Sequence, residues 1–237
     1  MRNNQVGVLV IVPLLFVAWN GVNRSDDDVV SLTGTVVFAG TVPASMPINM
    51  AADDYCDGLQ QGTPVSTPVV VDGQGRVADV LVYVKEGVSG GFPDPEGEVV
   101  LGQSGCRYTP RVVAVRTGQT LRIRNDDDTF HNVHVLASVN RSFNIGQPIK
   151  GMQARRQFDD PEIGVDVKCD VHGWMQGYVH VLDNPFYAVT GGDGAFDLGS
   201  LPSGNYVVEA WHATLGSVTQ SVEISAGQPA SLELRFR

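Results

Sequence analysis

The chain has 237 residues, of which 43% are hydrophobic, and this is enough apolar material for one large β domain or two small ones. Its 26 acidic and 16 basic residues give a formal charge of −10, which argues against nucleic acid as a partner because the phosphate backbone would repel the chain. A basic protein partner is compatible with this charge. The 27 Gly and 13 Pro residues, together with short runs of Val and Thr, favour an all-β fold.

The N-terminal residues have the pattern of an export signal. Arg2 supplies one positive charge before an apolar run, Val6–Trp19, which is typical of a secretory signal peptide over residues 1–25. The run is shorter than the ~20 residues that span a bilayer comfortably. No clear cleavage site follows it, so an uncleaved membrane anchor stays open as the alternative. Both cases predict an exported protein, periplasmic or extracellular.

Several segments in the first half of the chain have the composition of strands or turns. A strand is predicted over Leu32–Phe38, and one helical turn is expected around Cys56 within residues 51–60. Val69–Val71 and Val77–Val84, on either side of an Asp-Gly turn, predict a hairpin.

The second half continues with short apolar runs separated by polar segments. Val112–Val115, Leu121–Arg124 and Tyr178–Leu182 predict strands. Asp126–Asp128 predicts a solvated acidic turn, with steering of a partner as the alternative. Residues 140–157 predict a long polar loop.

A compact set of metal-ligand residues lies in the loop that precedes the last of these strands. Cys169, His172 and Met175 follow the spacing Cys-x2-His-x2-Met, and His131 and His134 lie upstream. Two imidazoles, one thiolate and a weak thioether make a trigonal His2Cys set with an axial Met, the coordination of a blue copper centre. Zinc fits poorly, because a thioether is a weak ligand for it. Residues three apart on a strand point to opposite faces, so only one of the upstream histidines is expected to bind.

The segment Thr109–Leu182 resembles the cupredoxins, and within them the amicyanin and plastocyanin group. It matches in His131-Asn132-Val133-His134, in the Cys169–Met175 loop and in the strand Gly177–Val181 that follows it. The resemblance implies a cupredoxin-like Greek-key β-sandwich and one type 1 copper ion. It also implies that His131, with Cys169, His172 and Met175, forms the ligand set.

Two further residues are expected around the metal. Asn132 can tie the strand of the first ligand to the ligand loop, the alternative being an ordinary turn hydrogen bond. Trp174 lies between two ligands and is expected at the rim of the site, where it shields the copper, contributes to docking or simply packs. His134, His180 and His212 are expected to have structural roles.

The three cysteines are consistent with an exported protein. If Cys169 holds a metal, Cys56 and Cys106 remain, and an oxidising compartment allows them to form a disulfide. Two unrelated buried thiols are the alternative.

The C-terminal residues resemble a carboxypeptidase-regulatory or transthyretin-like (prealbumin-like) β-sandwich. The shared positions, which include an Asp-Gly hairpin turn and a Pro-x-Gly turn, are Thr190, Asp193, Gly194, Phe196, Leu201, Pro202, Gly204 and Tyr206. Such modules begin with a Gly-x-Val strand, for which Gly34-Thr35-Val36 is a candidate. In that case the copper module is inserted into, or packed across, a sandwich made from both chain ends.

The predicted organisation therefore has four parts. After residues 1–25 come an N-terminal β region, 30–107, and a cupredoxin-like copper domain, 108–183. The smaller prealbumin-like module occupies residues 184–237.

The ligand set predicts an exported blue copper protein that carries one electron at a time between redox proteins. Four protein ligands leave no position for a substrate, so we do not expect an enzyme. One alternative is a protein that binds and delivers copper outside the cytoplasm. Another is a structural surface protein whose β-sandwich fold is stapled by the metal.

Overall fold

The computed structural model describes residues 29–237, and the predicted signal or anchor at residues 1–25 lies outside the described residues. Within residues 29–237 the chain is almost entirely β, with one short helix, α1 (Asp54–Gly58), so the prediction of an all-β fold is confirmed. No helix in this part of the chain has the length and apolar character that crossing a membrane requires.

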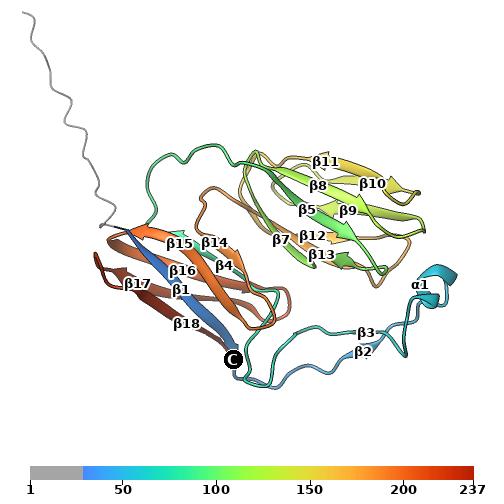
Figure 1. Ribbon diagram of the computed structural model, residues 1–237, viewed down its shortest axis with the longest axis horizontal. Helices are drawn as coiled ribbons and strands as arrows, with labels where there is room; N and C mark the ends of the chain where they lie inside the picture. The colour runs from blue at the N-terminus through green and yellow to red at the C-terminus, as the bar shows by residue number, and fades with distance from the viewer. Residues whose placement is uncertain (1–28) are drawn as a thin grey trace, which may run out of the picture.

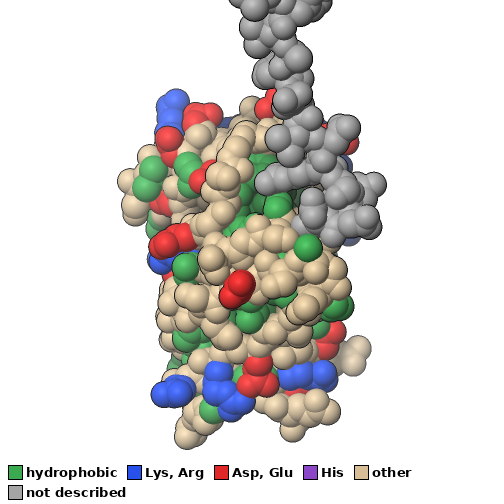
Figure 2. All heavy atoms as spheres, turned by 90° about the vertical axis from the view of Figure 1, so that its left-hand side faces the viewer, with side chains coloured by type: hydrophobic (Ala, Val, Ile, Leu, Met, Phe, Trp, Pro, Cys, Tyr) green, Lys and Arg blue, Asp and Glu red, His purple; other side chains and the backbone are tan. Residues whose placement is uncertain are grey.

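Both ends of the described chain contribute to one sandwich, the terminal sandwich, whose sheets have the orders β15-β1-β18 and β14-β4-β16-β17 (Figure 1). Its strands are β1 (Val29–Phe38), β4 (Leu81–Glu86), β14 (Tyr187–Val189), β15 (Ala195–Pro202), β16 (Gly204–His212), β17 (Gly216–Ile224) and β18 (Ala230–Phe236). β1 runs parallel to β18, so the first and last strands are neighbours. Gly34 is required in β1, because a Cβ there would collide with the carbonyl oxygen of Leu232 and the ring of Phe196. Figure 2 shows this end of the molecule, where small hydrophobic areas alternate with polar ones.

The residues between β4 and β14 form a second sandwich, the central sandwich, whose sheets have the orders β10-β9-β12-β13-β7 and β11-β8-β5-β6. Its strands are β5 (Glu98–Gln103), β6 (Tyr108–Thr109), β7 (Val112–Arg116), β8 (Thr120–Asn125), β9 (His131–Leu136), β10 (Phe143–Gln147), β11 (Gln153–Arg156), β12 (Glu162–Lys168) and β13 (Gln176–Leu182). β8 alternates between half-buried and buried residues, and its inward side chains Leu121 and Ile123 are fully buried. Valines of β9, β12 and β13 join them in one core.

Residues 39–66 form an arm that belongs to neither sandwich. The arm contains β2 (Met46–Pro47), α1 and β3 (Val65–Ser66), and Figure 1 shows it running from the terminal sandwich to one end of the central sandwich. Asp53 caps α1 by accepting a hydrogen bond from the backbone N–H of Cys56. Cys56 is disulfide-bonded to Cys106 of the central sandwich. The predicted disulfide and the predicted helical turn around Cys56 are therefore confirmed.

The two sandwiches pack against each other through β4. Its run Leu81–Val84 is buried on both faces, because Leu81 and Tyr83 point away from the terminal core and contact Ala114 and Leu182. His180 lies at the same junction. It accepts a hydrogen bond from the backbone N–H of Gly164 at 3.0 Å, and its ring meets the ring of Trp211 edge-on.

Two sequence predictions about local structure were wrong. Residues 140–157 contain the strands β10 and β11 rather than a continuous loop. Both are edge strands in which Gln147 is the one fully buried residue, so their sequences lack the apolar pattern of a core strand. The predicted hairpin around Asp72 is reduced to a single bridge between Val71 and Val77, since β4 pairs with β14 and β16 instead.

The buried histidines predict acid sensitivity. Burial lowers the pKa of His180 from 6.5 to about 3 and that of His212 to about 4, so below pH 6.5 the unfolded chain takes up protons that the folded chain does not. Stability should therefore fall as the pH is lowered from 6.5 towards 4, by up to about 1.4 kcal/mol per pH unit for each histidine. Urea denaturation at several pH values measures this slope. The variant His180→Asn, whose amide oxygen can replace Nδ1 as acceptor, should have a shallower slope, and an unchanged slope would contradict the assignment.

Candidate metal centre

Three of the four predicted ligands lie together at one end of the central sandwich. His131 is the first residue of β9, and Cys169 and His172 belong to the loop between β12 and β13. β9 and β12 are antiparallel neighbours, with Lys168 opposite His134, so the ligand loop emerges beside the start of β9. The ligand atoms of His131, Cys169 and His172 all lie within 4.8 Å of one another, and all three side chains are buried.

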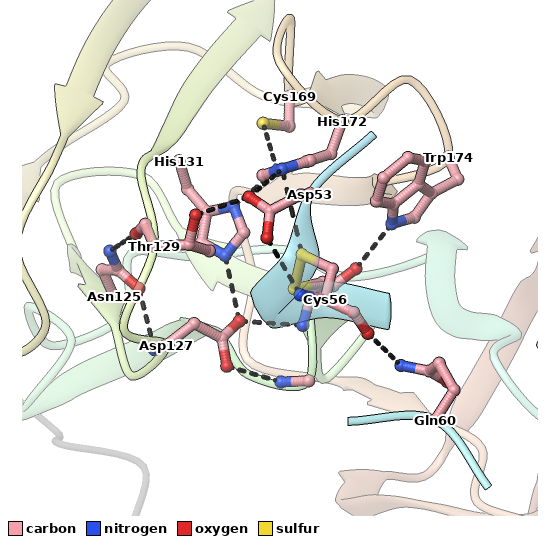
Figure 3. The surroundings of a disulfide bond; sticks show 12 residues. Asp53, Cys56, Gln60, Asn125, Asp127, Thr129, His131, Cys169, His172 and Trp174 are labelled. Carbon is pink, nitrogen blue, oxygen red and sulfur yellow. Dashed lines mark hydrogen bonds and ion pairs between the residues drawn. A yellow bond between two sulfur atoms is a disulfide. The ribbon is translucent and has the colours of Figure 1, made fainter. Parts of the chain in front are cut away.

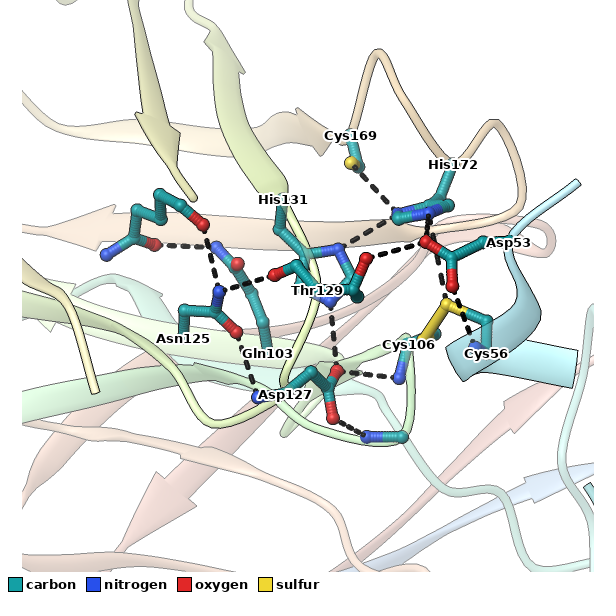
Figure 4. Close-up of polar contacts among 12 residues, drawn as sticks. Asp53, Cys56, Gln103, Cys106, Asn125, Asp127, Thr129, His131, Cys169 and His172 are labelled. Carbon is teal, nitrogen blue, oxygen red and sulfur yellow. Dashed lines mark hydrogen bonds and ion pairs between the residues drawn. A yellow bond between two sulfur atoms is a disulfide. The ribbon is translucent and has the colours of Figure 1, made fainter. Parts of the chain in front are cut away.

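The two histidine rings are held by carboxylates on their outer sides (Figure 4). His131 Nε2 lies 2.9 Å from Asp127 Oδ2, and His172 Nε2 lies 3.1 Å from Asp53 Oδ2. An ionised carboxylate only accepts hydrogen bonds, so both Nε2 atoms carry hydrogen. The two Nδ1 atoms, 2.9 Å apart, then present lone pairs to each other, and a cation is needed between them. That cation can be a proton or a metal ion.

The charges of the site agree with this arrangement. Burial alone would lower the pKa of His131, but hydrogen bonds to Asp127 and Cys169 outweigh it and raise the pKa to about 9. Burial would raise the pKa of Cys169, but hydrogen bonds with His131 and with the backbone of Asn132 outweigh it, so the pKa is lowered. The pKa of His172 is lowered, chiefly by burial. A metal ion therefore competes with one proton for the imidazoles, beside a thiol whose pKa is already lowered.

Met175 is at the end of the ligand loop, and its side chain lies in the core. Its backbone N–H donates to the carbonyl of His172 at 2.8 Å, and its carbonyl accepts from the N–H of Cys169 at 3.2 Å. The side chain is 1% exposed and belongs to the same hydrophobic core as Cys169. Two imidazoles and a thiolate, with a buried thioether in the same short loop, fit copper better than zinc.

Asn132 and Trp174 both contact the ligand loop. The Asn132 amide oxygen accepts from the backbone N–H of Asp170 at 2.7 Å and from the Cys169 thiol at 3.3 Å, which joins β9 to the loop. The Trp174 ring lies 5.0 Å from the His172 ring, and its Nε1 donates to the carbonyl of Cys106 at 3.0 Å (Figure 3). Asn132 therefore restrains the sulfur ligand, and Trp174 restrains the imidazole.

The remaining histidines lie outside the cluster. His134 points to the other side of β9 and pairs with Asp170 at 3.0 Å, with 32% of its side chain exposed. His180 lies at the junction of the sandwiches. His212 accepts hydrogen bonds from the backbone of Thr214 and Leu215.

Asp127 corrects a sequence prediction. The turn Asp126–Asp128 was expected to be solvated, but Asp127 is only 2% exposed. Besides His131, its carboxylate accepts hydrogen bonds from the backbone N–H groups of Gly105 and Cys106, each at 2.8 Å. These bonds lower its pKa against the opposing effect of burial. In the sequence, only its position four residues before His131 indicated that Asp127 lies near the site.

The sequence did not predict a role for Asp53, because this residue lies on the arm and reaches the site only through the folded structure. Burial would raise its pKa, but hydrogen bonds from Thr129, Cys56 and His172 outweigh this effect and lower the pKa to about 2. The Thr129 hydroxyl donates at 2.6 Å. Asp53 is therefore ionised over the physiological range and keeps its contact with His172.

The arm also covers the outer edge of His172. The sulfur of Cys56 lies 3.8 Å from His172 Nε2, and the Cys56–Cys106 disulfide holds α1 in this position (Figure 3). As a result His172 is only 1% exposed.

No model of a protein family matches this chain, and no curated protein matches it. Among solved structures, it is similar to a Cu-containing nitrite reductase from Thermus scotoductus, with 21% identity and a TM-score of 0.34, over 43% of this chain but only 25% of the reductase chain. It is also similar to a purple cupredoxin from Nitrosopumilus maritimus, with 20% identity and a TM-score of 0.31, over 37% of this chain and all of that one. A reduced Cu(I) form of an amicyanin variant has 26% identity and a TM-score of 0.32, over 37% of this chain and 85% of its own.

The contact between Asp53 and His172 predicts a specific loss in a conservative variant. Asp53→Asn keeps an oxygen to cap α1 but places an NH2 group opposite two donors, Thr129 and His172. Copper affinity, measured by competition with a chelator, should fall roughly 10–100-fold. The exposed neighbour Asp54 provides the control, and Asp54→Asn should keep the affinity. Equal affinity in the two variants would show that the carboxylate does not restrain the ring.

The disulfide predicts a second measurable effect. It closes a loop between residues 50 apart in the sequence, so replacing Cys56 and Cys106 with Ser should lower the free energy of unfolding by about 4 kcal/mol. Urea denaturation of the metal-free protein measures this loss. Cys169→Ser, which keeps the disulfide, is the control and should remain within about 2 kcal/mol of the parent protein.

Proposed function

We propose that this protein is an exported type 1 copper protein that carries single electrons between redox proteins. The observation that carries the proposal is the convergence of two Nδ1 lone pairs and one thiol with a lowered pKa in a buried site. In this proposal the central sandwich is a cupredoxin of the amicyanin and plastocyanin type. The terminal sandwich is a carboxypeptidase-regulatory-like module.

The residues around the site suit electron transfer because they restrict movement. Copper bound there would supply a centre that exchanges one electron between its Cu(I) and Cu(II) states. Asp127 and Asp53 hold the two imidazoles with Nδ1 inward, and Asn132 holds the thiol. Ligands fixed in this way change little between oxidation states, which keeps the reorganisation small. Burial excludes water and substrate, so we propose a carrier rather than an enzyme.

The same burial argues against copper delivery. A delivery protein has to pass its ion to the ligands of a partner, which requires access to the metal. Here His131, Cys169 and His172 are each at most 3% exposed, and the arm is attached over His172 by a disulfide. The disulfide also supports an oxidising, extracytoplasmic location.

Copper loading tests the proposal directly. Cu(II) added to the purified protein should give an intense blue colour, from the bond between the thiolate and the ion, that bleaches reversibly with a mild reductant. Cys169→Ser should remain colourless, whereas His134→Ala should stay blue because His134 lies outside the cluster. Pale protein with bound copper would favour capture or delivery, and a failure to bind copper would favour the structural alternative. Loss of colour in His134→Ala would overturn the ligand assignment.

A further inference from the structure

The ligands of the metal centre are sealed from solvent on the side of the arm. His172 has the α1 helix, Asp53 and the disulfide against its outer edge. Cys56 and Cys106 are both fully buried, so this cover is tightly packed. Because His131, Cys169 and His172 are each at most 3% exposed, an electron that enters or leaves the site must pass through another group.

Trp174 provides such a group. It is half-buried, it follows His172 by two residues in the ligand loop, and its ring lies 5.0 Å from the imidazole. Trp174 and Met175 both line a cleft of about 220 Å3, so the cleft borders one proposed ligand, Met175, and the tryptophan that contacts a second, His172. The cleft lies where the arm, the central sandwich and the start of the terminal sandwich meet.

The cleft has a local charge opposite to that of the whole chain. Two arginines, Arg107 and Arg111, line it together with a single carboxylate, Asp79. Arg111 is 3.9 Å from Asp79, whereas Arg107 donates to the carbonyl of Val65 and has no ion pair among residues 29–237. One guanidinium charge is thus uncompensated, in a protein whose formal charge is −10.

We infer that the cleft beside Trp174 is where electrons enter and leave, and that it accepts a carboxylate presented by a protein redox partner. This inference rests on the proposed function, since it requires copper behind Trp174. Arg107 would bind the carboxylate and align the partner, and Trp174 would provide contact with the His172 ligand. A guanidinium suits this role because its fork of N–H groups matches a carboxylate.

The salt dependence of electron transfer tests the inference with a simple anionic donor. Hexacyanoferrate(II) gives one electron to Cu(II), leaving Fe(III) and Cu(I), and no bond or proton is exchanged. If the anion reacts at the cleft, its rate constant should fall as salt is added, because salt screens the attraction to Arg107. If it reacts elsewhere on this acidic protein, salt should relieve a repulsion and the rate constant should rise. A rise would overturn the inference.

A pair of charge-matched variants locates the effect. Arg107→Gln should lower the hexacyanoferrate(II) rate constant roughly fivefold or more at low salt, the effect of one charge at close range in water. Arg235→Gln, on β18 of the terminal sandwich, removes the same charge and should change the rate constant much less. Both variants should keep the blue colour. Equal effects of the two substitutions would overturn the inference.

Binding to the metal-free protein gives a readout that does not depend on copper. Hexacyanocobaltate(III), which is redox-inert, and a tetraglutamate peptide should each shift the indole N–H signal of Trp174 in NMR spectra, and Arg107→Gln should abolish both shifts. Trp211 lies outside the cleft and is the internal control. If the peptide leaves Trp174 unshifted, a carboxylate-bearing partner is wrong. If the cleft binds both anions but the protein fails to bind copper, it is the proposed function that fails.

Discussion

The metal centre depends on two hydrogen bonds from imidazole to carboxylate. Asp127 and Asp53 each accept from an Nε2–H group, which turns the two Nδ1 lone pairs towards each other, beside the Cys169 sulfur. Without these acceptors each ring could take the other tautomer or rotate, and the donor set would lose its direction. The lowered pKa of Cys169 and the burial of the site follow from the same packing, since the hydrogen bonds offset the cost of burying charged groups.

Segments far apart in the chain cooperate to build this arrangement. The Cys169–Met175 loop and β9 supply the candidate metal-binding atoms, and the turn before β9 supplies Asp127. The arm supplies Asp53, and the Cys56–Cys106 disulfide anchors the arm to the central sandwich. The backbone N–H groups of Cys106 and its neighbour Gly105 both donate to Asp127. The disulfide, the carboxylates and the imidazoles therefore form one connected network. The arm closes one side of this network, and a cleft lined by Trp174 and Met175 lies beside it.

The sequence predicted that Cys169 and His172 lie together with His131, because the spacing of the loop is distinctive. Met175 as a ligand stays a prediction. The sequence also predicted the disulfide and the all-β fold, the first from the number of cysteines and the second from composition. It did not predict Asp53, whose contact with His172 depends on the path of the arm through space. Asp127 was placed in solvent because a run of three acidic residues is usually hydrated. β10 and β11 were missed because these edge strands bury few side chains, which leaves little apolar pattern in their sequences.

The tautomers of the two histidines test the central claim most directly. A long-range 1H–15N correlation spectrum of the Cu(I)-loaded protein, which is diamagnetic, distinguishes a protonated Nε2 from a protonated Nδ1. We expect His131 and His172 both to carry hydrogen on Nε2 and to bind the metal through Nδ1. A spectrum with hydrogen on Nδ1 of either residue would contradict it.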